Sequence, residues 1–181
     1  MTNRPGSVIW ITGLSGAGKT TLARELVVRM RALDTAVVML DGDDLREIFG
    51  MVETNTENYD REGRLLLALR YARMCQIIAD QGVTVVIATI SLFREVHIWN
   101  RAHISDYFEV YLKVPLEEVR RRDPKGIYQR FDAGELEHIA GLDLDIDEPE
   151  KPDVVVEFKP EKKVSEIAND LLSSLRTREP L

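Results

Sequence analysis

The sequence predicts a three-layer α/β domain, in which a parallel five-stranded β-sheet lies between layers of helices. Five runs of apolar, β-branched residues indicate the strands: residues 8–12, 36–41, 83–89, 108–114 and 153–158. The stretches between these runs show helical spacing, and strands that alternate with helices are typical of βαβ units. A length of 181 residues suits one domain of ordinary size. We therefore expect a single domain over residues 1–181.

The individual runs support this assignment in chain order. The first four strands are almost continuously apolar, as expected for parallel strands that are buried on both faces. A helix is predicted to begin near Lys19, where apolar residues recur at intervals of four. A second helix is predicted over residues 61–80, a shorter one after Glu95, and a last one over residues 164–175, docked on the domain.

Composition excludes several classes of function. With 31 acidic and 24 basic residues, the net charge of −7 argues against a nucleic-acid surface over the whole domain. The single cysteine, Cys75, excludes an intrachain disulfide and a cysteine-rich zinc site. No apolar run reaches the roughly 18 residues of a membrane span, and residues 1–7 lack the pattern of a signal peptide. We expect a cytoplasmic protein with no membrane partner. Any anion that it binds must be held in a local pocket.

Residues 13–20 read GLSGAGKT and match the phosphate-binding pattern G-x-x-x-x-G-K-[ST], between a predicted strand and a predicted helix. Glycines let the backbone wrap a phosphate with its N–H groups inward, and the helix N-terminus adds partial positive charge. Lys19 is expected to reach the β- and γ-phosphates, and the Thr20 hydroxyl to complete a Mg²⁺ shell. The sequence thus predicts a P-loop nucleotide-binding protein, with nucleotide contacts from Gly13, Ser15, Gly16, Ala17, Gly18, Lys19, Thr20 and Thr21.

The end of the second strand, DGDDLR at residues 41–46, favours a kinase over a GTPase. Carboxylates at the C-terminal end of a parallel strand lie at the same sheet edge as the P-loop, where ligands bind. Asp43 there can hold Mg²⁺ or take the proton of an attacking hydroxyl, and Arg46 can hold an anionic acceptor. The alternative is a polar turn that caps a helix, above all for Asp41. The sequence has no guanine-reading N-K-x-D, and D-x-x-G at residues 60–63 opens a helix.

Two polar segments, residues 50–59 and 123–152, fit neither the helical nor the strand period. Long loops in a compact domain are usually functional or disordered. In a nucleotide-binding fold they are candidates for a substrate-binding arm and, over residues 123–152, for a lid.

Six segments match motifs of a known protein family and occur in the same order as in that family: GLSGAGKTT (13–21), DGDDLR (41–46), DR (60–61), IS (90–91), RDPKGIY (122–128) and GLD (141–143). Together they resemble the adenylylsulfate (APS) kinase family over about residues 8–158. The pattern DGDxxR followed by RDPKG[IL]Y is far more specific than the P-loop alone. Members of that family transfer the γ-phosphoryl group of MgATP to the 3′-hydroxyl of adenylylsulfate.

The resemblance assigns roles to individual positions. It implies that Asp43 is the magnesium-side carboxylate and the base, so that Thr20 and Asp43 hold the metal. It further implies catalytic roles for Lys19, Ser91 and Lys125, and a phosphate contact for Arg122. The acceptor site that it implies consists of Asp41, Asp43, Arg46, Arg61, Ile90, Ser91, Lys125, Ile139, Gly141 and Leu142.

Departures from the family pattern concern the acceptor. The family clamps adenine between two phenylalanines, in a G-F-S and an F-T-G-I-D segment. Here residues 51–59 contain no G-F-S, and Ile139 stands at the second position. The E-N that follows D-R in the family is replaced by Gly63 and Arg64, which removes an asparagine that contacts the acceptor. Because stacking on an aromatic side chain is worth about 1–3 kcal/mol per base, these changes point to a kept reaction and a changed acceptor.

The sequence therefore predicts ATP- and Mg²⁺-dependent phosphorylation of a hydroxyl on a small anionic nucleotide. Adenylylsulfate is the leading acceptor by family weight, which would make the protein an enzyme of sulfate assimilation. The alternatives are a related kinase that acts on another conjugate, such as cytidine diphosphoramidate, and an ATP-binding regulatory module without catalysis. The oligomeric state stays open, with a homodimer as one option.

Overall fold

The computed structural model describes residues 5–50 and 60–177 of the chain. Within these ranges the strands are β1 (Val8–Thr12), β2 (Val37–Asp41), β3 (Thr84–Ala88), β4 (Tyr107–Lys113) and β5 (Val154–Glu157). They form one parallel sheet in the order β2-β3-β1-β4-β5. Each strand agrees with its predicted run to within one residue at either end, and the predicted five-stranded parallel α/β fold is confirmed.

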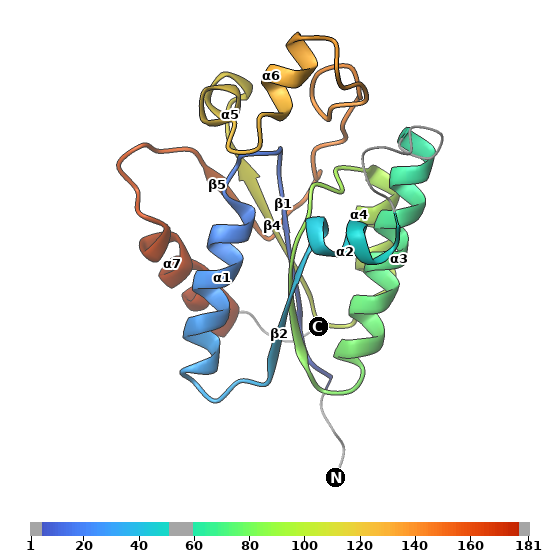
Figure 1. The fold of residues 1–181 in the computed structure, drawn as a ribbon. Coiled ribbons are helices and arrows are strands. Elements are labelled where there is room, and N and C mark those ends of the chain that lie inside the picture. Colours follow the sequence, from blue (N-terminus) through green and yellow to red (C-terminus); the bar gives the residue numbers. More distant parts are fainter. Residues whose placement is uncertain (1–4, 51–59, 178–181) are drawn as a thin grey trace.

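Helices cover both faces of this sheet (Figure 1). Helices α1 (Lys19–Arg31) and α7 (Val164–Thr177) pack against one face, and α3 (Arg61–Ala79) and α4 (Arg94–His103) against the other. Three short helices complete the set: α2 (Gly42–Ile48), α5 (Leu116–Arg122) and α6 (Ile127–Asp132). Helical spacing predicts the four long helices but misses α2 and α6, because six or seven residues contain too few turns to show a period.

The hydrophobic core lies in two halves, one on each face of the sheet. Along β1 the side chains alternate, so that Ile9 and Ile11 join the half beneath α1 and α7, whereas Val8 and Trp10 join the half beneath α3 and α4. Every residue of β1 is fully buried. Cys75 lies buried in the second half, where its thiol packs among apolar side chains. The sheet is therefore a rigid frame for the loops at its edges.

The segments that follow the strands meet at the C-terminal edge of the sheet. The P-loop follows β1, α2 follows β2, and α5 follows β4. The first part of residues 123–152, which includes α6, lies above this edge at the top of Figure 1. The later part runs down to β5, and Arg101 on α4 donates to the Lys151 carbonyl oxygen there. Of the predicted substrate-binding arm at residues 50–59, residues 51–59 lie outside the described residues. Among the described helices, none combines the length and the apolar character needed to cross a membrane.

Candidate active site

The P-loop has the backbone conformation that its glycines predict. Gly13 adopts a φ of 151°, and a β-carbon at this position would lie 2.7 Å from the carbonyl oxygen of Leu112 on β4. Gly18, the N-cap of α1, adopts a φ of 97° in the left-handed region. Both conformations favour glycine. The hydroxyl of Tyr128 on α6 donates a hydrogen bond to the carbonyl oxygen of Ser15 at 3.0 Å, which attaches residues 123–152 to the loop.

Lys19 lies at the centre of this loop. Its Nζ donates a hydrogen bond to the carbonyl oxygen of Leu14 at 2.7 Å. Burial lowers the pKa of Lys19 to about 7, while the nearby carboxylate of Asp41 acts in the opposite direction. Because desolvation disfavours the charged form of Lys19, its ammonium group is poised to gain from a phosphate group at the loop.

Asp41 connects the P-loop to β2. The Thr20 hydroxyl donates to its carboxylate at 2.6 Å, and its other oxygen accepts the backbone N–H of Asp43 at 2.9 Å. Asp41 therefore caps α2, as the alternative interpretation expects, and also contacts the residue that the P-loop motif predicts to bind Mg²⁺. The sequence does not predict the hydrogen bond between the Thr20 hydroxyl and the Asp41 carboxylate.

Asp43 stands at the start of α2 and forms ion pairs with two cations. Arg46, on the next turn of α2, donates to one of its carboxylate oxygens, and Lys125, between α5 and α6, donates to the other. The Asp43 carboxylate thus joins the edge of the sheet to residues 123–152. Two cations and one carboxylate at this point form a positively charged region that suits a transferring phosphoryl group.

A cavity of about 870 Å³ opens between the P-loop, α2 and residues 122–140. Its volume lies within the range of small-molecule sites. The structure brings most of the predicted site residues together around this cavity: Ser15, Gly16, Gly18, Lys19, Thr20, Thr21, Asp41, Asp43, Arg46, Ile90, Arg122, Lys125 and Ile139.

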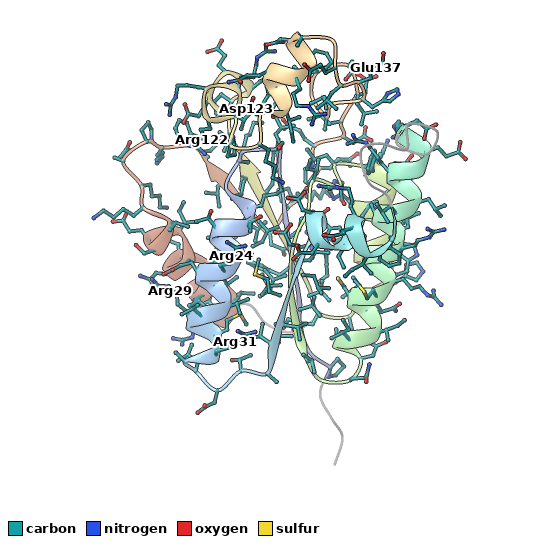
Figure 2. The ribbon with its side chains drawn as sticks, in the orientation of Figure 1. Arg24, Arg29, Arg31, Arg122, Asp123 and Glu137 are labelled. Atoms are coloured by element: carbon teal, nitrogen blue, oxygen red, sulfur yellow. The ribbon has the colours of Figure 1, made fainter. Side chains whose placement is uncertain are left out.

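Arg122 lies beside the P-loop at the end of α5. Its Nε donates to Glu118 at 2.8 Å, its Nη1 donates to the Gly16 carbonyl oxygen at 3.4 Å, and its guanidinium lies 4.8 Å from the centre of the Phe158 ring. Figure 2 shows Arg122 and Asp123 next to each other at the top of the sheet. Phe158 and Glu118 therefore support Arg122. The Glu118 contact follows from i,i+4 spacing on α5, whereas no local pattern in the sequence indicates the Phe158 contact.

Gly141 and Leu142 of the predicted acceptor site lie outside the main cavity, as do Gly13 and Ala17. Gly13 and the buried Ala17 shape the P-loop. Gly141 packs against Leu14, since a β-carbon there would lie 3.1 Å from the Leu14 side chain, and Leu142 lines the same separate surface cavity as Gly141.

Ser91 follows β3 and is buried. It adopts a φ of 27°, and its hydroxyl lies 2.8 Å from that of Thr89 in a shared hydrogen bond. A positive φ in a residue other than glycine is uncommon and is often found at functional sites. Ser91 lines a smaller cavity that adjoins the main one. The catalytic role predicted for Ser91 stays a prediction.

Arg61 is not among the residues that line either of these cavities. Its Nη2 donates to Asp147 at 3.1 Å, its guanidinium pairs with Glu95 at 3.4 Å, and it lies 5.4 Å from the centre of the Phe93 ring. These partners, Glu95 first, raise the pKa of Arg61. Its carboxylate partners come from α4 and from residues 123–152, which sequence spacing does not bring together. The acceptor contact expected from the resemblance stays a prediction.

The fold and this site define a P-loop kinase, with a phosphate-binding loop, a carboxylate at the neighbouring strand end and basic residues from the overlying segment. Residues 5–157 match the model of the family described as adenylylsulphate kinase. The chain belongs to this family, and it is an ATP-dependent phosphotransferase with an alcohol group as acceptor.

Individual relatives are similar over most of their length. The chain is 38% identical over 150 residues to the cytidine diphosphoramidate kinase of Campylobacter jejuni. The aligned region covers 83% of this chain and 85% of the relative. It is 37% identical over 149 residues to the adenylyl-sulfate kinase of Picosynechococcus sp., with 82% of each chain covered. The structure of the Mycobacterium tuberculosis APS kinase in complex with AMPPNP and APS superposes with a TM-score of 0.86 at 29% identity, over 96% of this chain and 99% of that one.

The lowered pKa of Lys19 predicts proton uptake on nucleotide binding. With a pKa of about 7, Lys19 in the free enzyme is mostly neutral at pH 8, whereas bound phosphates favour its charged form. Binding of MgATP should therefore take up about one proton at pH 8 and much less at pH 6. Titration calorimetry in buffers of different ionisation enthalpy measures this uptake. Equal uptake at both pH values would contradict the assignment.

Proposed function

We propose that the protein transfers the γ-phosphoryl group of ATP, with Mg²⁺, to a hydroxyl group of a small anionic nucleotide, with adenylylsulfate as the leading acceptor. The observation that carries this proposal is the arrangement of Lys19, Asp43 and Lys125 around one cavity. In the reaction, the acceptor oxygen bonds to the γ-phosphorus, the bond to the β-phosphate oxygen breaks, and ADP leaves. Such transfer depends mainly on positioning and charge neutralisation.

The residues at the P-loop fit a magnesium ion. Mg²⁺ prefers oxygen ligands and is usually held by one or two protein groups together with substrate phosphates and water. The Thr20 hydroxyl and the Asp41 carboxylate supply such oxygens in direct contact, and Asp43 adds a third group nearby. Among the described residues no cluster of three or more histidine, cysteine or acidic side chains forms a complete metal cage. A bound Mg²⁺ supplies charge neutralisation on the phosphates.

The remaining charged residues have separate roles in binding the phosphates, accepting the proton and binding the acceptor. Lys19 and Arg122 lie at the P-loop and neutralise the phosphates of ATP, while Lys125 reaches the same region from residues 123–152. Asp43 takes the proton of the attacking hydroxyl, and Arg46 holds the anionic part of the acceptor. Residues 123–152 act as the lid that excludes water during transfer. The intact set of charged groups speaks against a regulatory module without catalysis.

The nucleobase of the acceptor has two candidates: adenine, as in adenylylsulfate, and cytosine, as in cytidine diphosphoramidate. Ile139 is buried at the cavity wall, and its backbone N–H donates to Asp143 at 2.6 Å, which fixes an aliphatic side chain there. An aliphatic wall offers less stacking to a purine than a phenylalanine does. The similarity to a cytidine diphosphoramidate kinase supports cytosine. The similarity to adenylyl-sulfate kinases supports adenine. Tyr59, the aromatic residue nearest to the missing G-F-S segment, lies outside the described residues.

A panel of acceptors tests this proposal. Phosphorylation of adenylylsulfate, cytidine diphosphoramidate and simple nucleoside diphosphates is measured with ATP and Mg²⁺, for the wild type, Ile139→Phe and the aliphatic control Ile139→Leu. Ile139→Phe is expected to lower the KM for adenylylsulfate by about tenfold relative to the cytidine conjugate, from the gain in stacking, and Ile139→Leu to change neither. An unchanged ratio in Ile139→Phe would remove Ile139 from the base-binding site.

The wider setting of the enzyme follows from its acceptor. We infer a cytoplasmic enzyme, of sulfate assimilation if adenylylsulfate is the acceptor and of capsule assembly if the cytidine conjugate is. The neighbouring genes distinguish these two settings. A homodimer stays a prediction, which the molar mass in solution tests.

A further inference from the structure

Two arginines lie where the main cavity meets its smaller neighbour. The smaller cavity has a volume of about 40 Å³ and is lined by Ser91, Phe93 and apolar residues of α3. The residues that line both cavities define the junction between them: Arg46, Arg64, Thr89, Ile90 and Ala140. Arg46 and Arg64 are the charged members of this junction. Arg64 stands at the position of the asparagine that contacts the acceptor in the family pattern, and it brings a positive charge to that position.

The fold places Arg64 there through the register of α3. The buried stripe of this helix includes Leu67 and Tyr71, three and seven residues after Arg64 on the same face. Arg64 continues this stripe into the first turn, where the helix extends to the C-terminal edge of the sheet and reaches the cavities. Its half-buried side chain thus occupies a core-facing position with a cationic head at the cavity wall.

The charges around the junction favour an anion. On the side of the main cavity, the Asp43 carboxylate is shared between Arg46 and Lys125. Four further acidic residues line the main cavity but not the junction: Asp41, Asp44, Glu135 and Glu137. On the side of the smaller cavity, Asp145 is the acidic lining residue. Arg61 on the same helix lines neither cavity, and its guanidinium is engaged with Glu95 and Asp147. Of the two arginines in the first turn of α3, the one that faces the cavities is Arg64.

We propose that Arg64 and Arg46 together hold the anionic group of the acceptor, a sulfate or phosphate attached to a nucleoside 5′-phosphate. This inference rests on the proposed function and names the residue that selects charged acceptors. The planar guanidinium offers several donors in a fixed fork that matches the oxygens of such a group. Arg46 also contacts Asp43, so the anionic group and the reacting hydroxyl lie within the length of one small nucleotide.

Kinetics with matched variants test the proposal. Arg64→Gln is expected to raise the acceptor KM by about 10- to 100-fold, the scale of a lost hydrogen bond between charged groups, with less than about a twofold change in the KM for ATP. Arg64→Lys should raise the acceptor KM less than Arg64→Gln does, because lysine keeps the positive charge but lacks the planar guanidinium. Arg70→Gln, on the exposed face of α3 and outside both cavities, is the control that should match the wild type. A larger rise in KM for Arg61→Gln than for Arg64→Gln would overturn the proposal.

Binding measurements separate this inference from the proposed function. Dissociation constants are measured with AMPPNP in the donor site for two pairs of probes, adenosine with adenylylsulfate and cytidine with cytidine 5′-diphosphate. The wild type should prefer the charged member of at least one pair, and Arg64→Gln should reduce that preference by about tenfold or more. A preference that is absent in the wild type or unchanged in Arg64→Gln overturns the role of Arg64, whatever the turnover. A wild type that binds charged probes but phosphorylates none rejects the proposed function alone.

Discussion

Replacement of Lys19 by alanine is expected to lower the rate of phosphoryl transfer by about 10³-fold or more, the scale of a cation that stabilises the transferring group. The Nζ of Lys19 lies within the P-loop, bonded to the Leu14 carbonyl oxygen. No second cation in the described part of the loop replaces it, because Arg122 and Lys125 reach the cavity from α5 and the following segment. Affinity for ATP should fall together with the rate.

The fold should persist in Lys19→Ala. Burial lowers the pKa of Lys19, so its charged form is less stable in the folded protein than in the unfolded chain. Its removal should therefore leave the melting temperature unchanged or raise it. Arg31→Ala is a matched control, because Arg31 lies on the same helix away from the cavity, as Figure 2 shows. Turnover of Lys19→Ala near that of the wild type would contradict the P-loop mechanism.

Asp43→Asn is expected to lower kcat by about 10²-fold or more, the usual scale for the loss of a general base. The asparagine keeps the shape of the side chain but cannot take a proton, and it removes the carboxylate that Arg46 and Lys125 share. The ion pair with Lys125 is partly exposed, so the loss in stability should be about 1 kcal/mol or less. A large kinetic effect with a small change in melting temperature is the expected combination.

A control for Asp43 is available on the same short helix. Glu47 lies on the exposed side of α2 and lines neither the main cavity nor its smaller neighbour, so Glu47→Gln should behave as the wild type. Arg46→Ala should raise the acceptor KM more than it changes kcat, since Arg46 is assigned to binding. Equal and small effects of Asp43→Asn and Arg46→Ala would show that DGDDLR is only a structural turn.

The sequence predicts the frame of this molecule well, for a physical reason. Parallel strands that are buried on both faces are continuously apolar, and β1, β3 and β4 are buried at every residue except Lys113, as this pattern predicts. The same prediction is wrong for β2, because β2 lies at the edge of the sheet and is only half-buried after Val37. The P-loop is predicted equally well, because glycine is required where the backbone has a positive φ, as at Gly18. The packing of Cys75 follows from its place on the apolar face of α3.

Contacts between distant segments are the part that the sequence does not predict. Local pattern places Asp43 and Lys125 in two motifs but does not show that their side chains pair across 82 positions. The engagement of Arg61 by Asp147 depends in the same way on the path of residues 123–152. The sequence does contain one signal for Arg64. Arg64 has the helical spacing of the buried residues of α3 but carries a charge, which marks a position where the buried face of the helix reaches a cavity.

The central claim is phosphoryl transfer from ATP to a hydroxyl of a small anionic nucleotide. The most direct measurement is transfer of the γ-phosphoryl group of isotope-labelled ATP to adenylylsulfate or cytidine diphosphoramidate, with the product identified by mass spectrometry. The predicted result is a new phosphate ester on the acceptor, formed together with ADP in equal amounts and lost in Lys19→Ala. Hydrolysis of ATP without any labelled acceptor, or labelling that persists in Lys19→Ala, would contradict the account.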